Sequence, residues 1–378
     1  MASSTTSPMH IPFKDLPLHP DHPPHSAWGV WGKDDQLGCL NRLTPECIKK
    51  AAAEVKTGVS IGLNWSMDEM HVPPFYRTDE QTVPKTYRLL TALPSPVIRP
   101  GTLELGLFRL TLHTLSVYNV PETIISQTFR PTYLTARDPQ QDDRLEFNTQ
   151  TSTQWDGFRH WAFPDGRFYN GFTQAELKSG TSQRNGIQEW AKRGIVGRGV
   201  LIDYVEHAKS VAAASGTPDS YDPWSATAIP VSTIQEIARK CNITFEPGDI
   251  LLLRTGFVHR YERLSEAELQ AKMADQNMTY PGLKGSLESL EWLWDTQFSC
   301  VGADSPGFEV WQGGLGVMEF RMHETILSGL GLPIGELFDL EELARQCAKE
   351  KRWTFMFTSE VLNVPGGVAS PPNALAIM

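Results

Sequence analysis

Residues 248–256 read Gly-Asp-Ile-Leu-Leu-Leu-Arg-Thr-Gly, and this stretch decides the fold class. A short apolar run that is followed by a turn is typical of a β-strand. The surrounding sequence repeats the pattern, because further apolar strands are predicted at 199–203 and 298–304 with helical segments between them. Alternating strands and helices indicate an α/β domain.

The helices of this second half carry start signals in the sequence. Ser232-Thr-Ile-Gln235 and Ser265-Glu-Ala-Glu268 match the capping box, in which a hydroxyl residue is followed three positions later by Glu or Gln. Further helices are predicted at 286–295, 319–329 and 340–350.

The first half reads mostly as β-structure. A helix is predicted at 45–56, because Thr44 can cap it and Pro45 suits its first position. A strand follows at 59–65 and a loop at 73–101. Residues 103–117 alternate between apolar and polar with one change of phase, which indicates a long strand with a β-bulge, and 124–160 continue in this style.

These patterns predict one α/β domain of mixed sheets over residues 28–378, and not a doubly wound Rossmann fold. No internal repeat or linker divides this region. Residues 1–27 are rich in Pro, His and Ser and are predicted to form an extended arm over the body.

Composition narrows the class of protein. The formal net charge is −10 and no Lys/Arg block occurs, which argues against nucleic acid or an anionic membrane as partner. The five cysteines form no CxxC pair, which favours a reducing compartment. The N-terminus lacks the features of a signal peptide, and no apolar run approaches 18 residues. We therefore expect a cytoplasmic enzyme that acts on a small molecule.

Several common catalytic signatures are absent from the sequence. It contains no G-x-G-x-x-G before a helix and no G-x-x-x-x-G-K-[ST], which are typical of dinucleotide and nucleotide sites. The nucleophile elbow G-x-S-x-G and the zinc motif H-E-x-x-H are missing as well. The chemistry must therefore lie elsewhere.

One segment, Gln150-Thr-Ser-Thr-Gln-Trp-Asp-Gly-Phe-Arg-His160, carries an unusual density of polar groups. If it is extended, a period of two places Gln150, Gln154, Asp156 and His160 on one face. A straight strand would hold Asp156 and His160 about 13 Å apart, but Gly157 offers a bend that brings them together. Such a pair can bind metal or relay a proton. The alternative is a polar strand edge in which the histidine merely pairs with the aspartate.

Two residues of the second half are further candidates. His323 falls in the helix predicted at 319–329, where a histidine is more often a core residue than a ligand. Glu336 is flanked by Ile334, Gly335, Leu337 and Phe338. A carboxylate in such apolar surroundings needs a partner, a proton or a metal.

Together these segments resemble the cyclase family, a family that includes bacterial kynurenine formamidases and isatin hydrolases. Within the family the resemblance is to the fungal-type branch. That family carries H-x-G-T-H-x-D-x-P-x-H, and Asp156 and His160 fall on its last Asp and His. His323 and Glu336 fall on a later His and Glu, with one extra residue between them. Supporting matches follow the same order at 31–46, 197–203, 248–256, 301–307 and 330–337.

The resemblance implies a swivelling β/β/α fold, a homodimer or homotetramer, and a site for divalent metal. In two-metal relatives the two motif histidines and the Asp hold one ion, and the Asp, later His and Glu hold the other. Here Gln150 and Gln154 replace those two histidines, and glutamine is a poor zinc ligand. The resemblance therefore implies a single Zn or Mn ion on Asp156, His323 and Glu336, with His160 as acid/base.

We expect a hydrolase of a cyclic or N-acyl amide, a lactam or a lactone. Gln150 and Gln154 become candidate substrate contacts, together with four pocket candidates: Trp65, Trp155, Arg159 and Trp311. One alternative is a metal-independent cyclase, dehydratase or isomerase of secondary metabolism that uses Asp156, His160 and His323. The other alternative is a catalytically inactive binder of small molecules.

Overall fold

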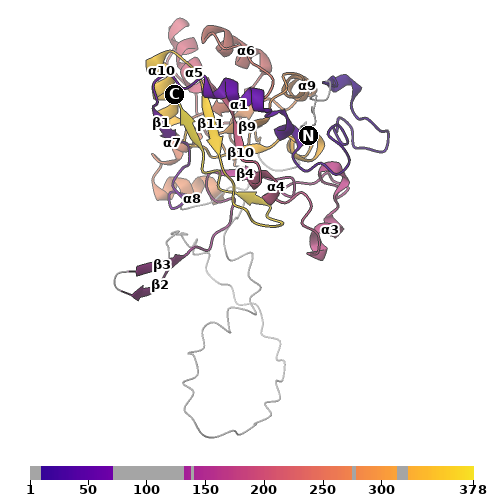
Figure 1. The fold of residues 1–378 in the computed structure, drawn as a ribbon. Helices are drawn as coiled ribbons and strands as arrows, with labels where there is room; N and C mark the ends of the chain where they lie inside the picture. Colours follow the sequence, from indigo (N-terminus) through magenta and orange to yellow (C-terminus); the bar gives the residue numbers. More distant parts are fainter. Residues whose placement is uncertain (1–9, 71–131, 138–139, 275–277, 313–321) are drawn as a thin grey trace, which may run out of the picture.

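The computed structural model describes residues 10–70, 132–137, 140–274, 278–312 and 322–378. Within these residues, nine strands form one sheet in the order β1-β13-β11-β5-β7-β9-β10-β4-β12 (Figure 1). Their bounds are β1 Ser60–Gly62, β13 Leu375–Ile377, β11 Thr354–Ser359, β5 Ile195–Asp203, β7 Ile250–Arg254, β9 Cys300–Ala303, β10 Ile334–Glu336, β4 Gln154–Asp156 and β12 Ala369–Ser370. Two small sheets pair β2 (Thr132–Arg137) with β3 (Gln140–Arg144), and β6 (Ala228–Ile229) with β8 (Gly282–Leu283).

The four central strands β5, β7, β9 and β10 run parallel, and the outer pairings of the large sheet are antiparallel. Strand β7 is buried on both faces: Leu251 and Leu253 belong to the core on one side, Ile250 and Leu252 to the core on the other. A strand that is covered on both faces needs an apolar residue at every position, which explains the continuous run in the sequence.

Helices cover both faces of the sheet. α6 (Val231–Lys240) and α9 (Leu287–Asp295) contribute Ile234 and Leu290 to the first core, whereas α10 (Glu341–Glu350) contributes Leu343 to the second. The predicted α/β fold with a mixed sheet is therefore confirmed. The remaining α-helices in the described part of the chain are α1 Pro45–Ala52, α3 Gln174–Ser179, α4 Gln188–Ala191, α5 Tyr204–Ala214, α7 Phe257–Tyr261 and α8 Glu266–Ala274, and Thr325–Gly329 (η6) forms a π-helical turn.

Two predicted helix starts are confirmed by their hydrogen bonds. The Thr44 side chain accepts from the N–H of Cys47 at 3.3 Å and so caps α1. At α8, the Ser265 hydroxyl accepts from the N–H of Glu268, and the Glu268 carboxylate accepts from the N–H of Ser265 at 2.8 Å. These are the two reciprocal bonds of a capping box.

The capping box predicted at Ser232 is wrong. Helix α6 already begins at Val231, with Pro230 in the capping position and no side-chain cap. The carbonyl of Pro230 accepts from the N–H groups of Thr233 and Ile234 at 3.0 and 3.3 Å, so the helix starts before Ser232 and leaves this residue exposed in the first turn. The strand predicted at 59–65 is also shorter, because β1 covers only Ser60–Gly62.

Some predictions lie outside the described residues. These are the loop at 73–101, the long bulged strand at 103–117, residues 124–131 and 138–139 of the β-region predicted at 124–160, residues 1–9 of the predicted arm, and the first part of the helix at 319–329. Of that helix, the structure describes a helical turn at 323–324 that runs into the π-helical turn η6.

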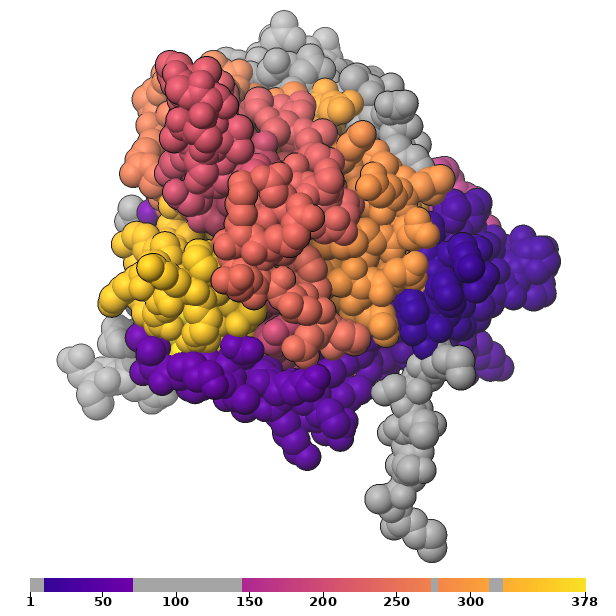
Figure 2. All heavy atoms as spheres, turned by 90° about the horizontal axis from the view of Figure 1, so that it is seen from above, coloured from indigo at the N-terminus to yellow at the C-terminus, as the bar shows by residue number. Residues whose placement is uncertain are grey.

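Both ends of the described chain pack against the body. The N–H groups of Thr57 and Gly58 donate to the carbonyl of Met378 at 3.0 and 2.8 Å, next to the pairing of β1 with β13. Figure 2 accordingly shows the violet segment near residue 50 lying along the yellow C-terminal residues. Near the other end, Phe13 and Leu16 are buried in the first core. No helix in the described ranges is long and apolar enough to cross a membrane.

Candidate active site

A turn at the end of β4 brings Asp156 and His160 together. The N–H of His160 donates to the carbonyl of Gly157 at 2.9 Å, and Nε2 of His160 lies 3.5 Å from Oδ2 of Asp156. A Cβ atom on Gly157 would lie 2.5 Å from the carbonyl oxygen of Val368, so only glycine fits at this crossing of two backbones. The predicted bend is confirmed, but Gly157 does not have a positive φ, so glycine is required here by the close approach and not by the turn.

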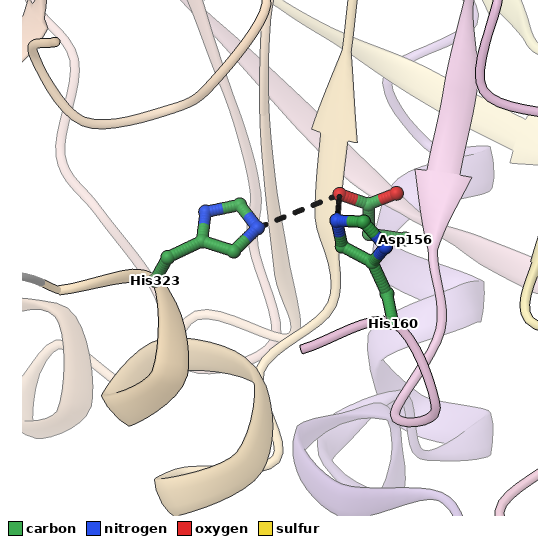
Figure 3. Close-up of side chains that lie close together, drawn as sticks. All are labelled: Asp156, His160 and His323. Atoms are coloured by element: carbon green, nitrogen blue, oxygen red, sulfur yellow. Dashed lines mark ion pairs between the residues drawn. The ribbon is translucent and has the colours of Figure 1, made fainter. Parts of the chain in front are cut away.

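His323, the candidate from the helix predicted at 319–329, approaches the same carboxylate oxygen as His160. Its Nε2 lies 3.6 Å from Oδ2 of Asp156, and Figure 3 shows the rings of His160 and His323 directed at this single oxygen. Ligand atoms of Asp156, His160 and His323 all lie within 4.8 Å of one another. We call these three residues the Asp156 cluster.

Strand pairing places Glu336 beside the cluster. β4 and β10 are antiparallel with Gln154 opposite Glu336, so Gln154, Asp156 and Glu336 share one face of the sheet. Nε2 of Gln154 donates to Oε2 of Glu336 at 2.5 Å, and all three side chains are buried. Glu336 is not one of the three residues whose ligand atoms lie within 4.8 Å.

Gln150 reaches the cluster from a loop and not from a strand. Residues 149–153 form turns and bends, so the extended conformation considered for this part of the segment does not occur. Nε2 of Gln150 nevertheless donates to Oδ1 of Asp156 at 3.0 Å and lies 2.6 Å from Nδ1 of His160. Both glutamine amides therefore donate to carboxylates of the site.

The buried carboxylates of the site favour a positive charge at His323. Burial acts to lower the pKa of His323, but the carboxylates of Glu309, Asp156 and Glu336 outweigh it and raise that pKa well above its usual range. Three buried carboxylates around one imidazole need a proton or another cation for compensation.

Glu309 escaped the sequence analysis, although its side chain is only 2% exposed and its Oε1 lies 3.1 Å from Nδ1 of His323. It stands in the run Phe308-Glu309-Val310-Trp311. A carboxylate between apolar residues is the same signal that identified Glu336, so this signal was available.

Two of the pocket candidates point elsewhere. Trp155 belongs to the core on the face opposite Asp156, and its Nε1 donates to the Ser359 hydroxyl at 2.9 Å. Arg159 donates to three backbone carbonyls and so ties two loops together; they belong to Ser182, Arg184 and Gly366. The structure brings neither residue to the Asp156 cluster.

The other two candidates belong to an aromatic cluster next to the polar site. Trp311 stacks on Tyr280 at 6.2 Å and follows Glu309 by two residues. The N–H of Trp65 donates to the hydroxyl of Thr153 at 2.7 Å, directly before Gln154. Trp311 is therefore close in the chain to Glu309, and Trp65 is hydrogen-bonded to the residue that precedes Gln154.

Comparison with known proteins shows the family of this chain. The model of the Cyclase family matches residues 91–310, more than half of the chain. The chain belongs to the cyclase family. The matched region contains Asp156, His160 and Glu309, whereas His323 and Glu336 lie beyond it.

Solved structures show the same fold as this cyclase-family chain. The crystal structure of a novel cyclase is 26% identical, with a TM-score of 0.66, and the match covers 93% of this chain and 99% of that one. Isatin hydrolase A from Ralstonia solanacearum is 15% identical, with a TM-score of 0.51 and coverage of 88% and 97%. No curated protein matches the chain.

The donor atoms of the Asp156 cluster fit a divalent cation. Ligands at 2.0–2.1 Å from a tetrahedral ion lie roughly 3.4 Å apart, close to the 3.5 and 3.6 Å that separate Asp156 Oδ2 from the two histidine nitrogens. Nε2 of His323 and Oε1 of Gln154 are buried and accept or donate no hydrogen bond among the described residues. Imidazole and carboxylate are also the usual ligands of zinc and manganese.

Proposed function

We propose that the chain is a metal-assisted hydrolase that opens a lactam or lactone, or cleaves an N-acyl amide. The observation that carries the proposal is the convergence of His160 and His323 on Oδ2 of the buried Asp156, in a member of the cyclase family. This arrangement combines a candidate ion site with an imidazole that can transfer protons.

Asp156 and His323 hold the ion in this proposal, and Glu336 is the third protein ligand. Glu336 shares the sheet face of Asp156 and contributes to the raised pKa of His323, which supports its place near the ion. Gln154 holds the Glu336 carboxylate by its amide donor. When bound, a divalent ion lowers the pKa of a water ligand toward neutrality and polarises a scissile carbonyl.

His160 acts as the acid/base. Its side chain is 13% exposed, whereas that of Asp156 is fully buried, so His160 forms the more accessible side of the pair. An imidazole can take a proton from the attacking water and return it to the leaving nitrogen or oxygen. Gln150 holds both Asp156 and His160 and so keeps this imidazole beside the carboxylate.

The test is elemental analysis of the purified, tag-free protein together with single variants. We expect about one ion per chain in the wild type, and its loss in His323→Ala and Glu336→Gln. His160→Ala should keep the ion and lose about 100-fold or more in hydrolysis of a panel of N-acyl amides, lactams and lactones. If His160→Ala loses the ion and Glu336→Gln keeps it, the third ligand is His160.

A second candidate function is metal-independent acid/base catalysis of a ring closure, dehydration or isomerisation. The observation that favours it is the pair of neutral glutamine amides on Asp156 and Glu336, where the resemblance implies histidine ligands. A folded wild type that contains no metal and cannot be reconstituted with Zn²⁺ or Mn²⁺ would reject the hydrolase proposal and support this one.

A further inference from the structure

We propose that Glu309 is a positioning residue that fixes the imidazole of His323 and so directs its Nε2 at Asp156. The inference rests on the proposed ion site and extends it, because it assigns the residue that sets which nitrogen of His323 faces the ion. Glu309 lies outside the motif stretches on which the family resemblance was recognised in the sequence.

The two ring nitrogens of His323 have different partners. Nδ1 lies 3.1 Å from Oε1 of Glu309, and Nε2 lies 3.6 Å from Oδ2 of Asp156. A carboxylate only accepts hydrogen bonds, so Glu309 requires the proton on Nδ1. In a neutral imidazole the lone pair then remains on Nε2, the atom that faces the Asp156 cluster. A carboxylate behind a histidine ligand raises its basicity and fixes its orientation.

The two neighbours of Glu309 in the chain, Phe308 and Val310, are both hydrogen-bonded to the backbone of Leu283 in β8. The N–H of Leu283 donates to the carbonyl of Phe308 at 3.0 Å, and the N–H of Val310 donates to the carbonyl of Leu283 at 2.9 Å. Gly282 packs so closely that a Cβ there would lie 2.4 Å from the carbonyl carbon of Glu309. Strand β8 therefore fixes the backbone position of Glu309.

The His323 ring is held on its remaining side as well. Trp161 packs against it edge to face, with 5.1 Å between ring centroids. Glu309 itself has no other ionic partner among the described residues, and none of them hydrogen-bonds its Oε2. Burial of a carboxylate costs free energy, and a single contact to an imidazole offsets only part of this cost. The burial of Glu309 therefore suggests a functional role for this contact.

The first experiment measures metal affinity of the full chain by competition with a chromophoric chelator, using Zn²⁺ as the probe. Glu309→Gln keeps the size and an acceptor oxygen but removes the charge, and we expect binding to weaken about 10- to 100-fold. The matched control is Asp249→Asn. It also removes a buried carboxylate, but one paired with Arg198 at the start of β7, and its affinity should stay within about twofold of wild type.

The second experiment does not depend on metal. In the ¹⁵N-labelled, metal-free protein, we expect the Nδ1–H of His323 to give a downfield, slowly exchanging signal that moves upfield in Glu309→Gln. An unchanged signal, or unchanged zinc affinity in a folded Glu309→Gln variant, overturns the inference. If wild type binds no zinc but the signal moves, the ion site is rejected while the positioning role of Glu309 stands.

Discussion

At the scale of single residues, Gly157 stands where the chain turns between Asp156 and His160, so that His160 returns to the carboxylate of Asp156. Gly157 lets the chain pass close to the carbonyl of Val368, to which its own N–H donates at 3.0 Å. A side chain at this position would disturb this close approach.

We therefore predict that Gly157→Ala destabilises the protein and displaces His160. The added Cβ meets a backbone oxygen at 2.5 Å, which cannot move away as a flexible side chain would. Overpacking of this kind costs about 1–3 kcal/mol, measurable by urea unfolding. Gly62→Ala is the control, because a Cβ there meets nothing within 4 Å, and it should change the free energy of unfolding by less than ~0.5 kcal/mol. Equal stability of the two variants would contradict the prediction.

At the scale of elements, two sequence segments with the same capping-box pattern differ in whether a helix starts there. Both begin with serine and carry Gln or Glu three residues later. Only Ser265 makes the reciprocal bonds, because α6 already begins at Val231 and Ser232 lies inside its first turn. The sequence pattern alone cannot distinguish them.

We predict that Ser265→Ala lowers the free energy of unfolding by about 1 kcal/mol, because it leaves an N–H at the start of α8 without its acceptor. Ser232→Ala should be neutral within ~0.3 kcal/mol, since this exposed serine caps nothing and alanine is the better helix former. Urea unfolding of both variants checks the prediction. A larger loss in Ser232→Ala than in Ser265→Ala would refute it.

At the scale of the whole molecule, charged residues gather where the parallel strands end. β5 ends at Asp203 and β7 at Arg254, which pair at 2.8 Å, and Asp304 follows β9. Asp304 is buried and accepts from the N–H and hydroxyl of Thr255 and from the N–H of Gly256. Asp203, Arg254 and Asp304 form a polar layer at this edge, and Glu336 ends β10 at the same edge.

This layer makes global stability depend on pH. Burial raises the pKa of Asp304 to about 6 despite the hydrogen bonds from Thr255, which act to lower it. The folded state then binds the proton more tightly than the unfolded state, whose aspartates have pKa values near 3.8. The stabilisation is complete below the unfolded value and is lost as pH rises through about 6.

We predict that the stability difference between wild type and Asp304→Asn falls by ~2 kcal/mol from about pH 4.5 to pH 7. Comparison with the asparagine variant removes the contributions of all other titrating groups. Urea unfolding of both proteins across this range is the measurement. A difference that does not change with pH would show that Asp304 ionises normally in the folded protein.

The sequence by itself determined those features of the structure that depend on residues close together in the chain. The run at 250–253 indicated a buried strand, Thr44 and Ser265 indicated helix starts, and Asp156 with Gly157 and His160 indicated a bend. Spacing and cap chemistry act over a few residues, so the sequence contains them. The prediction of Trp155 as a pocket residue was wrong, and alternation along the strand already contradicted it, because its neighbours Gln154 and Asp156 face the site.

Only the tertiary structure decided which distant groups meet. The antiparallel pairing of β4 with β10 places Gln154 against Glu336, and β8 holds Glu309 where it reaches His323. The three carbonyls that engage Arg159 lie up to 207 positions away in the chain. Such contacts result from how strands and loops pack against one another. No periodicity or spacing within one segment contains that information, because burial of the shared core fixes it for all elements together.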